Sequence, residues 1–453
     1  MHDMWPEEDC VRSQRDDDLT REINRLTPPS HTTVSHVATP FEQLTSFARQ
    51  TAVRMALLGA ATTFGTAIGI TALDHFHKRK EQRQAQFPHQ RPVTVDIHGT
   101  EATVYTYGAD VYADMLAAIR SAEVSIYLES YIWKNDEVGL EFKDAVIDAA
   151  QRGVEVYLIY DTFANLVVPR EFFRFPSNVH VLAYPLFRPQ ILLLNLKYTG
   201  RDHRKILVVD EAVGFVGGFN IGSVYATQWR DTHLKLTGPG VWELTNAFVS
   251  FWNHNRTEAL PLIEPSATPD WLPRIQTAEN APIRQVYPVR NIYLSAIRRA
   301  THHIYLTQAY FIPDDVFLQD LLDAAARGVD VRVIVPEASN HVITDWLSRG
   351  LYSKLLRGGV TIWLYQNAMV HAKTCTVDGE WTTIGTANID RLSLQGNYEI
   401  NMSIYSVELA QEMEKVFALD LSNCRRLDLD EWENRPVMNR IGERVLTPLT
   451  PLL

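Results

Sequence analysis

Cysteine is scarce in this chain, and basic residues are outnumbered by acidic ones. Only three cysteines occur in 453 residues, Cys10, Cys375 and Cys424, and no two have metal-ligand spacing. The odd count argues against a disulfide framework, so a reducing compartment is the simplest fit. The 43 Lys and Arg face 54 Asp and Glu, a net charge of −11. A field of that sign repels phosphate backbones and disfavours a general nucleic-acid binder.

The composition also excludes a disordered or low-complexity protein. Hydrophobic residues make up 46% and charged residues 21% of the composition, which are values of a globular protein with enough apolar material for a core. At roughly 150 residues per domain, the length predicts about three units, or one large duplicated domain with additional segments.

One stretch has no charge at all. Residues 55–73, MALLGAATTFGTAIGITAL, contain no charged side chain from the first position to the last. A helix of that length measures about 28 Å, close to the roughly 30 Å hydrocarbon core of a bilayer. We predict a transmembrane helix; the alternative is a buried helix of a soluble domain. A cleaved signal peptide is disfavoured, because the run starts far from the N-terminus and no small-x-small cleavage site follows it.

Basic residues around this run predict its orientation. Arg49 and Arg54 precede it, and five basic residues follow it: Lys78, Arg79, Lys80, Arg83 and Arg91. The positive-inside rule then places the long C-terminal part in the cytoplasm, held at the cell membrane by a single pass. The predicted segments are a polar N-terminal tail (1–50), a transmembrane anchor (51–77) and a basic linker (78–92).

From about Val93 the chain alternates strand-like and helix-like patterns, which predicts an α/β fold. Helical spacing covers 113–122 and 138–151, and strand-like runs cover 124–128 and 154–160. The same order returns as helices over 292–300 and 316–327 and strands over 304–307 and 329–335.

The two passages also match letter by letter. Ala-Ile-Arg at 118–120 recurs at 296–298, Ile-Tyr-Leu at 126–128 recurs at 304–306, and Arg-Gly-Val at 152–154 recurs at 327–329. A period this long indicates a duplicated domain rather than a solenoid. We predict two repeats, over 93–265 and 266–453.

A motif with polar, chemically useful residues is duplicated in the same register. Both copies read H-x-K-x4-D, as His203, Lys205 and Asp210 and again as His371, Lys373 and Asp378. An asparagine and then a carboxylate follow each histidine at matching intervals; these are Asn220 and Asp231 in the first copy, Asn388 and Glu399 in the second. One such motif alone is usually an exposed polar strand face, but two complete copies are strong support for a site.

The local pattern explains how these side chains can converge. A histidine and a lysine two residues apart share one face of a strand, and strand-like runs follow at 206–209 and 374–377. The next short strands, 213–216 and 381–384, each lead to a turn of glycine and small residues. Such turns let an anion approach backbone N–H groups.

These residue types suit phosphodiester transfer through a covalent intermediate. One neutral histidine can act as nucleophile and one protonated histidine as acid. Two lysines and two asparagines can hold the phosphoryl oxygens, and a carboxylate can orient each imidazole. No metal site and no cofactor are expected, because no cluster has ligand spacing.

The chain resembles the phospholipase D superfamily and, within it, the bacterial cardiolipin synthases. The first motif region carries DHRKILVVD (202–210), VGGFNI (216–221) and WRDTH (229–233). The second carries YFIPD (310–314), RGVD (327–330), VHAK (370–373) and IGTAN (384–388). The resemblance covers about Val93 to Leu453. It implies a duplicated phospholipase D-type domain of two pseudo-twofold halves, each a β-sheet layered with helices.

The resemblance also implies roles. One histidine, by analogy His203, attacks phosphorus, and the other protonates the leaving alcohol. The donor and acceptor are both phosphatidylglycerol, and glycerol leaves. Phosphate contacts are expected from Lys205, Lys373, Asn220 and Asn388, and Asp231 and Glu399 are expected to orient His203 and His371 respectively. Asp210 and Asp378 complete the set of six catalytic-motif residues, as structural partners rather than direct participants.

The sequence departs from the family in two places and leaves alternatives open. Only one membrane helix is predicted where many members carry two, and Arg391-Leu392-Ser393-Leu394 replaces the usual Arg-Ser-Phe. A phospholipase D that hydrolyses phospholipid and a non-catalytic membrane scaffold remain alternatives, and self-association is left open. The apolar segment 187–196, FRPQILLLNL, is predicted to be either a lip that dips into the bilayer or a buried strand or helix.

Overall fold

The computed structural model describes residues 85–188, 198–267 and 274–452. The predicted tail and anchor, the first part of the predicted linker (78–84) and most of the predicted lip (189–196) therefore lie outside the described residues. Within the described ranges, no helix is both long and apolar enough to cross a membrane.

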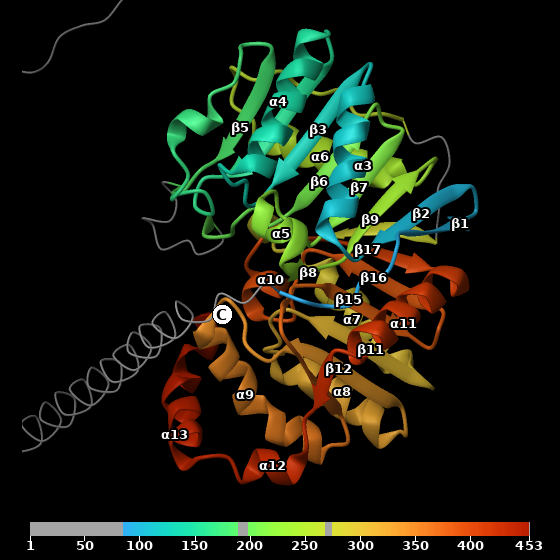
Figure 1. Cartoon of the computed structure of the whole chain (residues 1–453), viewed down its shortest axis with the longest axis vertical. Coiled ribbons are helices and arrows are strands. Elements are labelled where there is room, and N and C mark those ends of the chain that lie inside the picture. The colour runs from blue at the N-terminus through green and yellow to red at the C-terminus, as the bar shows by residue number, and fades with distance from the viewer. Residues whose placement is uncertain (1–84, 189–197, 268–273, 453) are drawn as a thin grey trace, which may run out of the picture. The chain divides into compact units, whose positions relative to one another are not determined.

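The first half of the described chain builds an eight-stranded sheet with the strand order β1-β2-β9-β7-β6-β3-β4-β5 (Figure 1). Its elements are β1 (Val93–Ile97), β2 (Thr100–Tyr105), α3 (Gly108–Ser121), β3 (Ser125–Ser130), α4 (Glu137–Gln151), β4 (Glu155–Asp161), η2 (Arg170–Phe173), β5 (Val179–Tyr184), β6 (Lys205–Val209), β7 (Val213–Gly217), α5 (Ser223–Thr227), β8 (Trp229–Arg230), β9 (His233–Thr237) and α6 (Val241–Asn255).

The second half repeats this plan with the strand order β10-β17-β16-β15-β11-β12-β13-β18. Its elements are β10 (Ile275–Glu279), η5 (Pro282–Arg284), α7 (Pro288–Arg299), β11 (His303–Gln308), α8 (Asp315–Ala326), β12 (Asp330–Pro336), α9 (Val342–Arg357), β13 (Thr361–Tyr365), β14 (Met369–Val370), β15 (Lys373–Val377), β16 (Trp381–Gly385), α10 (Arg391–Gln395), β17 (Ile400–Tyr405), α11 (Val407–Leu421), β18 (Cys424–Arg426), α12 (Leu429–Glu433), α13 (Val437–Leu446) and η6 (Thr447–Leu452).

The predicted duplicated α/β architecture is confirmed, with element ends that differ by a few residues. The same local signals bound the corresponding helices of the two halves. Asp136 and Asp314 cap α4 and α8 by accepting a hydrogen bond from the backbone N–H three residues on. Gly153 and Gly328 follow these helices with φ of +97° and +90°, where an L side chain would be strained.

The two halves share an apolar core at their seam. Each sheet is covered on its outer face by its own helices, α3 and α4 in the first half and α7, α8 and α9 in the second. The inner cluster instead combines residues of both halves, among them Phe248 of α6 and Leu409 and Met413 of α11. Burial on this scale stabilises the pairing of halves through the hydrophobic effect.

A buried ion pair crosses the same seam. Arg230 of β8 donates to both carboxylate oxygens of Asp420 in α11, at 2.9 and 2.7 Å, and both side chains are almost fully buried. The pair lies beside the short parallel pairing of β8 with β14, in which Trp229 faces Met369 and Arg230 faces Val370. The two halves are thus joined by backbone, charge and apolar contacts together.

Removing one member of this pair should destabilise the fold strongly. We expect Asp420→Ala to lower the free energy of unfolding by about 3–5 kcal/mol, because it leaves Arg230 buried and uncompensated. Chemical denaturation at neutral pH measures the loss. Glu141→Ala, which breaks the exposed pair with Arg120, is the control and should cost about 1 kcal/mol or less. Equal losses in the two variants would contradict the bridging role of Asp420.

Candidate active site

The two motif histidines line one cavity at the seam between the halves. The cavity has a volume of about 250 Å³, and His203, His371, Asn220 and Asn388 all contribute to its wall. His203 and His371 each stand two residues before the lysine that begins a strand, β6 or β15. The central strands of both sheets therefore deliver their motifs to the same space.

Each histidine is paired with a carboxylate of the other half. His203 Nδ1 lies 2.9 Å from Glu399 Oε2, and His371 Nδ1 lies 2.6 Å from Asp231 Oδ2. The expectation from the sequence, which paired Asp231 with His203 and Glu399 with His371, is wrong. The pairing is crossed, so neither half contains a complete histidine–carboxylate pair.

Backbone hydrogen bonds across the seam explain the crossing. The N–H of His203 donates to the carbonyl oxygen of Tyr398 at 3.0 Å, and the N–H of His371 donates to that of Arg230 at 2.7 Å. Tyr398 and Arg230 immediately precede Glu399 and Asp231. Each bridge therefore holds the following carboxylate against the histidine of the opposite half.

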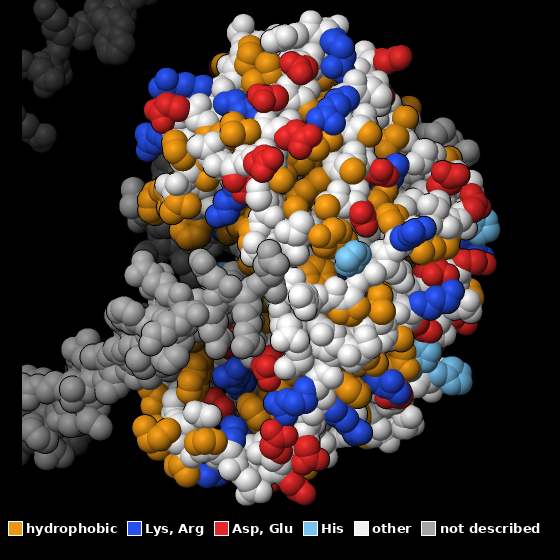
Figure 2. Space-filling view, viewed as in Figure 1, with side chains coloured by type: hydrophobic (Ala, Val, Ile, Leu, Met, Phe, Trp, Pro, Cys, Tyr) orange, Lys and Arg blue, Asp and Glu red, His pale blue; other side chains and the backbone are white. Residues whose placement is uncertain are grey.

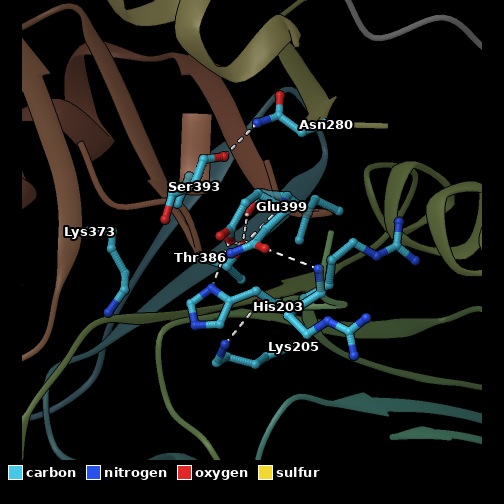
Figure 3. Close-up of polar contacts among 12 residues, drawn as sticks. His203, Lys205, Asn280, Lys373, Thr386, Ser393 and Glu399 are labelled. Carbon is cyan, nitrogen blue, oxygen red and sulfur yellow. Dashed lines mark hydrogen bonds and ion pairs between the residues drawn. The ribbon is translucent and has the colours of Figure 1, made fainter. Parts of the chain in front are cut away.

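The motif lysines lie beside the same imidazoles. Lys205 Nζ donates to the carbonyl oxygen of His203 at 2.8 Å. Lys373 Nζ lies 2.8 Å from His371 Nδ1 and also donates to the His371 carbonyl oxygen. Figure 3 shows Glu399 on one side of the His203 ring and the lysine side chains nearby, with Thr386 donating its hydroxyl to Glu399 Oε2 at 2.5 Å. The amino groups of both motif lysines therefore lie beside the histidines that line the cavity.

The two motif asparagines both line the cavity, but their hydrogen bonding differs. Asn220 Oδ1 accepts from the backbone N–H of Ile132 at 3.2 Å, which anchors that side chain. Asn388 Oδ1 is buried and has no hydrogen-bond partner among the described residues. A buried polar atom without a partner is costly, so this amide is available to a ligand.

Asp210 and Asp378 lie away from this site, and their place among the catalytic residues is a correction to the sequence prediction. Each follows the far end of its strand, about 17 Å along the chain from the motif lysine. Asp210 accepts backbone N–H groups of residues 123–125, and Asp378 accepts those of 301–303. Both residues have positive φ, 52° and 54°. They hold the connections from α3 to β3 and from α7 to β11, and they are not among the residues that line the cavity.

Burial and mutual charge shift the pKa of almost every group in the site. Burial, and then the charges of Lys205 and Lys373, hold the pKa of His203 well below its usual value; burial and Lys373 lower that of His371 to about 3. Burial also lowers the pKa of Lys205 to about 7 and of Lys373 to about 8. Both imidazoles are therefore neutral at pH 7.

The pKa values of the two carboxylates are shifted in opposite directions. Burial raises the pKa of Glu399 to about 8. Asp231 is equally buried, but Lys373 and the hydrogen bond with His371 more than offset the burial, and its pKa is lowered. Asp231 is therefore ionised beside His371, whereas Glu399 beside His203 is largely protonated at neutral pH. Two chemically similar pairs thus acquire different proton affinities.

Aromatic side chains that the sequence did not single out complete the wall. The ring of Tyr131 meets His203 edge-on at 4.5 Å between centroids, and Trp229 lies 4.9 Å from His371. Tyr310 lines the same cavity. Tyr131 and Tyr310 occupy equivalent places in the two repeats, because each closely follows a copy of the repeated Ile-Tyr-Leu string. The repeat was the signal that could have found Tyr131.

Comparison with known proteins identifies the family. The family model described as "Cardiolipin synthase, PLD-like domain" matches residues 115–252 and 293–421, more than half of the chain. The chain belongs to this family. Its curated relatives include the major cardiolipin synthase ClsA of Bacillus subtilis, 33% identical over 360 residues that cover 77% of this chain and 75% of the relative. A cardiolipin synthase of Clostridium perfringens is 32% identical, with coverage of 77% and 76%.

A solved structure supports the fold independently. The phosphatidylserine synthase of Haemophilus influenzae superposes with a TM-score of 0.60 at 15% identity, over 83% of this chain and 97% of that one. This likeness supports the fold of the chain across both halves. Within the described residues, no group of three or more His, Cys, Asp or Glu side chains is arranged to hold a metal ion.

The protonation of Glu399 should make the unfolding free energy of the protein depend on pH. Its pKa in the folded protein, about 8, lies above its ordinary value of 4.5, so its stabilising contribution is complete below pH 4.5 and is lost as the pH rises through 8. Glu399→Gln cannot ionise. We expect the unfolding free energy of the wild type, relative to Glu399→Gln, to fall by more than about 1 kcal/mol between pH 5 and pH 9.

Denaturation curves at several pH values measure this difference, and Glu380→Gln at an exposed turn is the control. A difference between wild type and Glu399→Gln that stays constant across this range would show that Glu399 is already ionised in the folded protein.

Proposed function

We propose that this protein is a cardiolipin synthase that transfers a phosphatidyl group from one phosphatidylglycerol to another and releases glycerol, through a phosphohistidine intermediate. The observation that carries the proposal is the crossed arrangement of two histidine–carboxylate pairs around a single cavity. Family membership and curated relatives of that name support the same activity.

In the first step, His203 is the nucleophile. Its Nδ1–H donates to Glu399 Oε2, which leaves the lone pair of Nε2 for the cavity. A bond forms between Nε2 and phosphorus, and the bond from phosphorus to the glycerol oxygen breaks. His371 gives a proton to that oxygen, and glycerol leaves. The lysines and asparagines stabilise the charge on the phosphoryl oxygens.

His371 is the acid because its carboxylate is the ionised one. Asp231, with a lowered pKa, favours the imidazolium form of His371. The pKa of His371 is about 3 in the empty site, but an anionic phosphodiester between the lysines favours the charged form of a neighbouring imidazole. Substrate binding therefore raises this pKa and prepares the proton that the leaving group needs.

In the second step, a hydroxyl group on the glycerol headgroup of the acceptor phosphatidylglycerol attacks phosphorus. Its proton passes to His371, the bond between phosphorus and His203 breaks, and cardiolipin leaves. A phosphodiester is exchanged for a phosphodiester, so the reaction is nearly balanced in energy. No nucleotide is required, and a chelator should leave the rate unchanged.

Attachment to a membrane is part of this proposal. A donor and an acceptor that are both phospholipids require access to a bilayer, which the predicted span at residues 55–73 and the predicted lip at 187–196 would provide. The catalytic halves would then lie on the cytoplasmic side, as the flanking basic residues predict.

A mixed-lipid assay tests the transferase reaction. With vesicles containing labelled phosphatidylglycerol, we expect labelled cardiolipin and free glycerol in equal amounts, with or without EDTA. Phosphatidic acid as the main product would show that water is the acceptor and that the protein is a hydrolase. Absence of both products would favour the non-catalytic scaffold.

Alanine substitutions test the histidines. His203→Ala and His371→Ala should each lower turnover by about 10²–10⁴-fold, the usual contribution of a positioned acid or base, without unfolding the protein. The wild type should show a bell-shaped pH profile. The exposed His302→Ala is the matched control. Trapping labelled phosphatidyl donor on His371→Ala but not on His203→Ala would identify the nucleophile; the reverse would exchange the two roles.

A further inference from the structure

A second cavity, which the mechanism does not use, lies on the other side of the motif strand. Its volume is about 210 Å³, and its wall includes Arg204, His254, Asn255, Arg284 and Tyr398. We refer to it as the rear cavity. It is comparable in size with the active-site cavity, and it lies where the end of α6 meets the turn that follows β10.

Side chains that alternate in direction along the chain separate the two cavities. His203 and Lys205 face the active site, so Arg204 between them points to the opposite side. The two residues before Glu399 alternate in the same way: Asn397 lines the active-site cavity and Tyr398 lines the rear cavity. The two cavities are therefore back to back, with the histidine strand as the wall between them.

Two arginines at the rear cavity have no acidic partner. Arg204 is neutralised by Glu129, at 2.7 Å, and by Glu279, at 2.9 Å. Arg284 lines the cavity, and Arg188 reaches it through a 2.5 Å hydrogen bond to Asn255 Oδ1. No carboxylate among the described residues lies within ion-pair distance of either of these two arginines.

These cationic groups converge on His254 at the end of α6. Burial, and then the positive charges of Arg284 and Arg188, lower the pKa of His254. On the face in Figure 2, by contrast, acidic and basic side chains are interspersed. Glu279 also lines the cavity but is paired with Arg204, so Arg188 and Arg284 are the cationic groups there that an external anion could pair with.

We propose that the rear cavity binds a phosphate group, either on a lipid headgroup or on a soluble phosphate ester. Guanidinium groups recognise phosphate through paired N–H donors, and Arg188 and Arg284 both have donors to spare. Arg188 Nε is buried and has no hydrogen-bond partner among the described residues. The ring of His254 and the hydroxyl of Ser250, which also lines the cavity, supply further donors.

Apolar side chains at the edge favour the lipid as the source. Phe187, next to Arg188, is 74% exposed, and Val286 at the rim is 49% exposed. Large apolar groups beside a cationic pocket are the combination that a phospholipid headgroup with its acyl chains would meet at a bilayer surface. This would be a second lipid contact, separate from the catalytic one.

The experiment compares three full-length proteins in a His203→Ala background, which prevents turnover. The first carries no further change, and the second carries Arg188→Gln with Arg284→Gln. The third, the control, carries Arg120→Gln with Arg298→Gln, which removes the same charge from exposed arginines paired elsewhere. Thermal melting establishes that all three are folded. Because binding is measured without turnover, failure of the proposed reaction would not affect this result.

Equilibrium dialysis with labelled inorganic phosphate and glycerol 3-phosphate, on protein held in phosphatidylcholine discs, is the first measurement. We expect the Arg188/Arg284 variant to lose one class of site, with affinity at least about tenfold weaker, and the control to match the parent. Equal binding in all three proteins would overturn the proposal.

The second measurement repeats the dialysis in discs that also contain phosphatidylglycerol. If the lipid headgroup is the source, it should displace phosphate from the site that depends on Arg188 and Arg284. If this site keeps its phosphate in such discs, the ligand is a soluble phosphate ester, and the rear cavity is a phosphate site without a lipid function.

Discussion

The rest of the site depends on two backbone hydrogen bonds that cross the seam. His203 donates to Tyr398, and His371 donates to Arg230, and each acceptor is followed directly by the carboxylate that contacts the opposing histidine. Since a carboxylate cannot move far from its own backbone, these two hydrogen bonds determine which carboxylate contacts which histidine. They also make the site a property of the joined halves, since separation of the halves would leave each histidine without its carboxylate.

The same seam explains the electrostatics. Two histidines, two lysines and two carboxylates are gathered in a region from which water is largely excluded, and burial disfavours every charged form. The imidazoles and the lysines of the site therefore have lowered pKa values. In the proposed reaction, an anionic phosphodiester would add negative charge to this cluster, so substrate binding would itself raise the pKa of His371. Asp231 and Glu399, whose pKa values shift in opposite directions, make the two halves chemically unequal although their folds match.

Much of the architecture could be predicted because it rests on local signals. Helices α4 and α8 follow an aspartate cap and end at a glycine with positive φ, and both features are written in short stretches of sequence. The repeated strings revealed the duplication, and the spacing of each motif revealed the residues that line the cavity. The same spacing led to the wrong histidine–carboxylate partners. Asp231 follows His203 at the motif interval along the chain, but backbone pairing across the seam places it against His371.

By itself, the sequence determined the composition of the site: two histidines, two lysines, two asparagines and two carboxylates, each on a strand or turn whose pattern is local. Only the tertiary structure decided their arrangement. The exchange of carboxylates between halves, the removal of Asp210 and Asp378 to distant turns, and the convergence of Arg188 and Arg284 behind the motif strand all depend on contacts between residues far apart in the chain. Local propensity is encoded in neighbouring residues, but the position of a charge in space, and hence its pKa and its partner, is set by which strands pair and which surfaces pack.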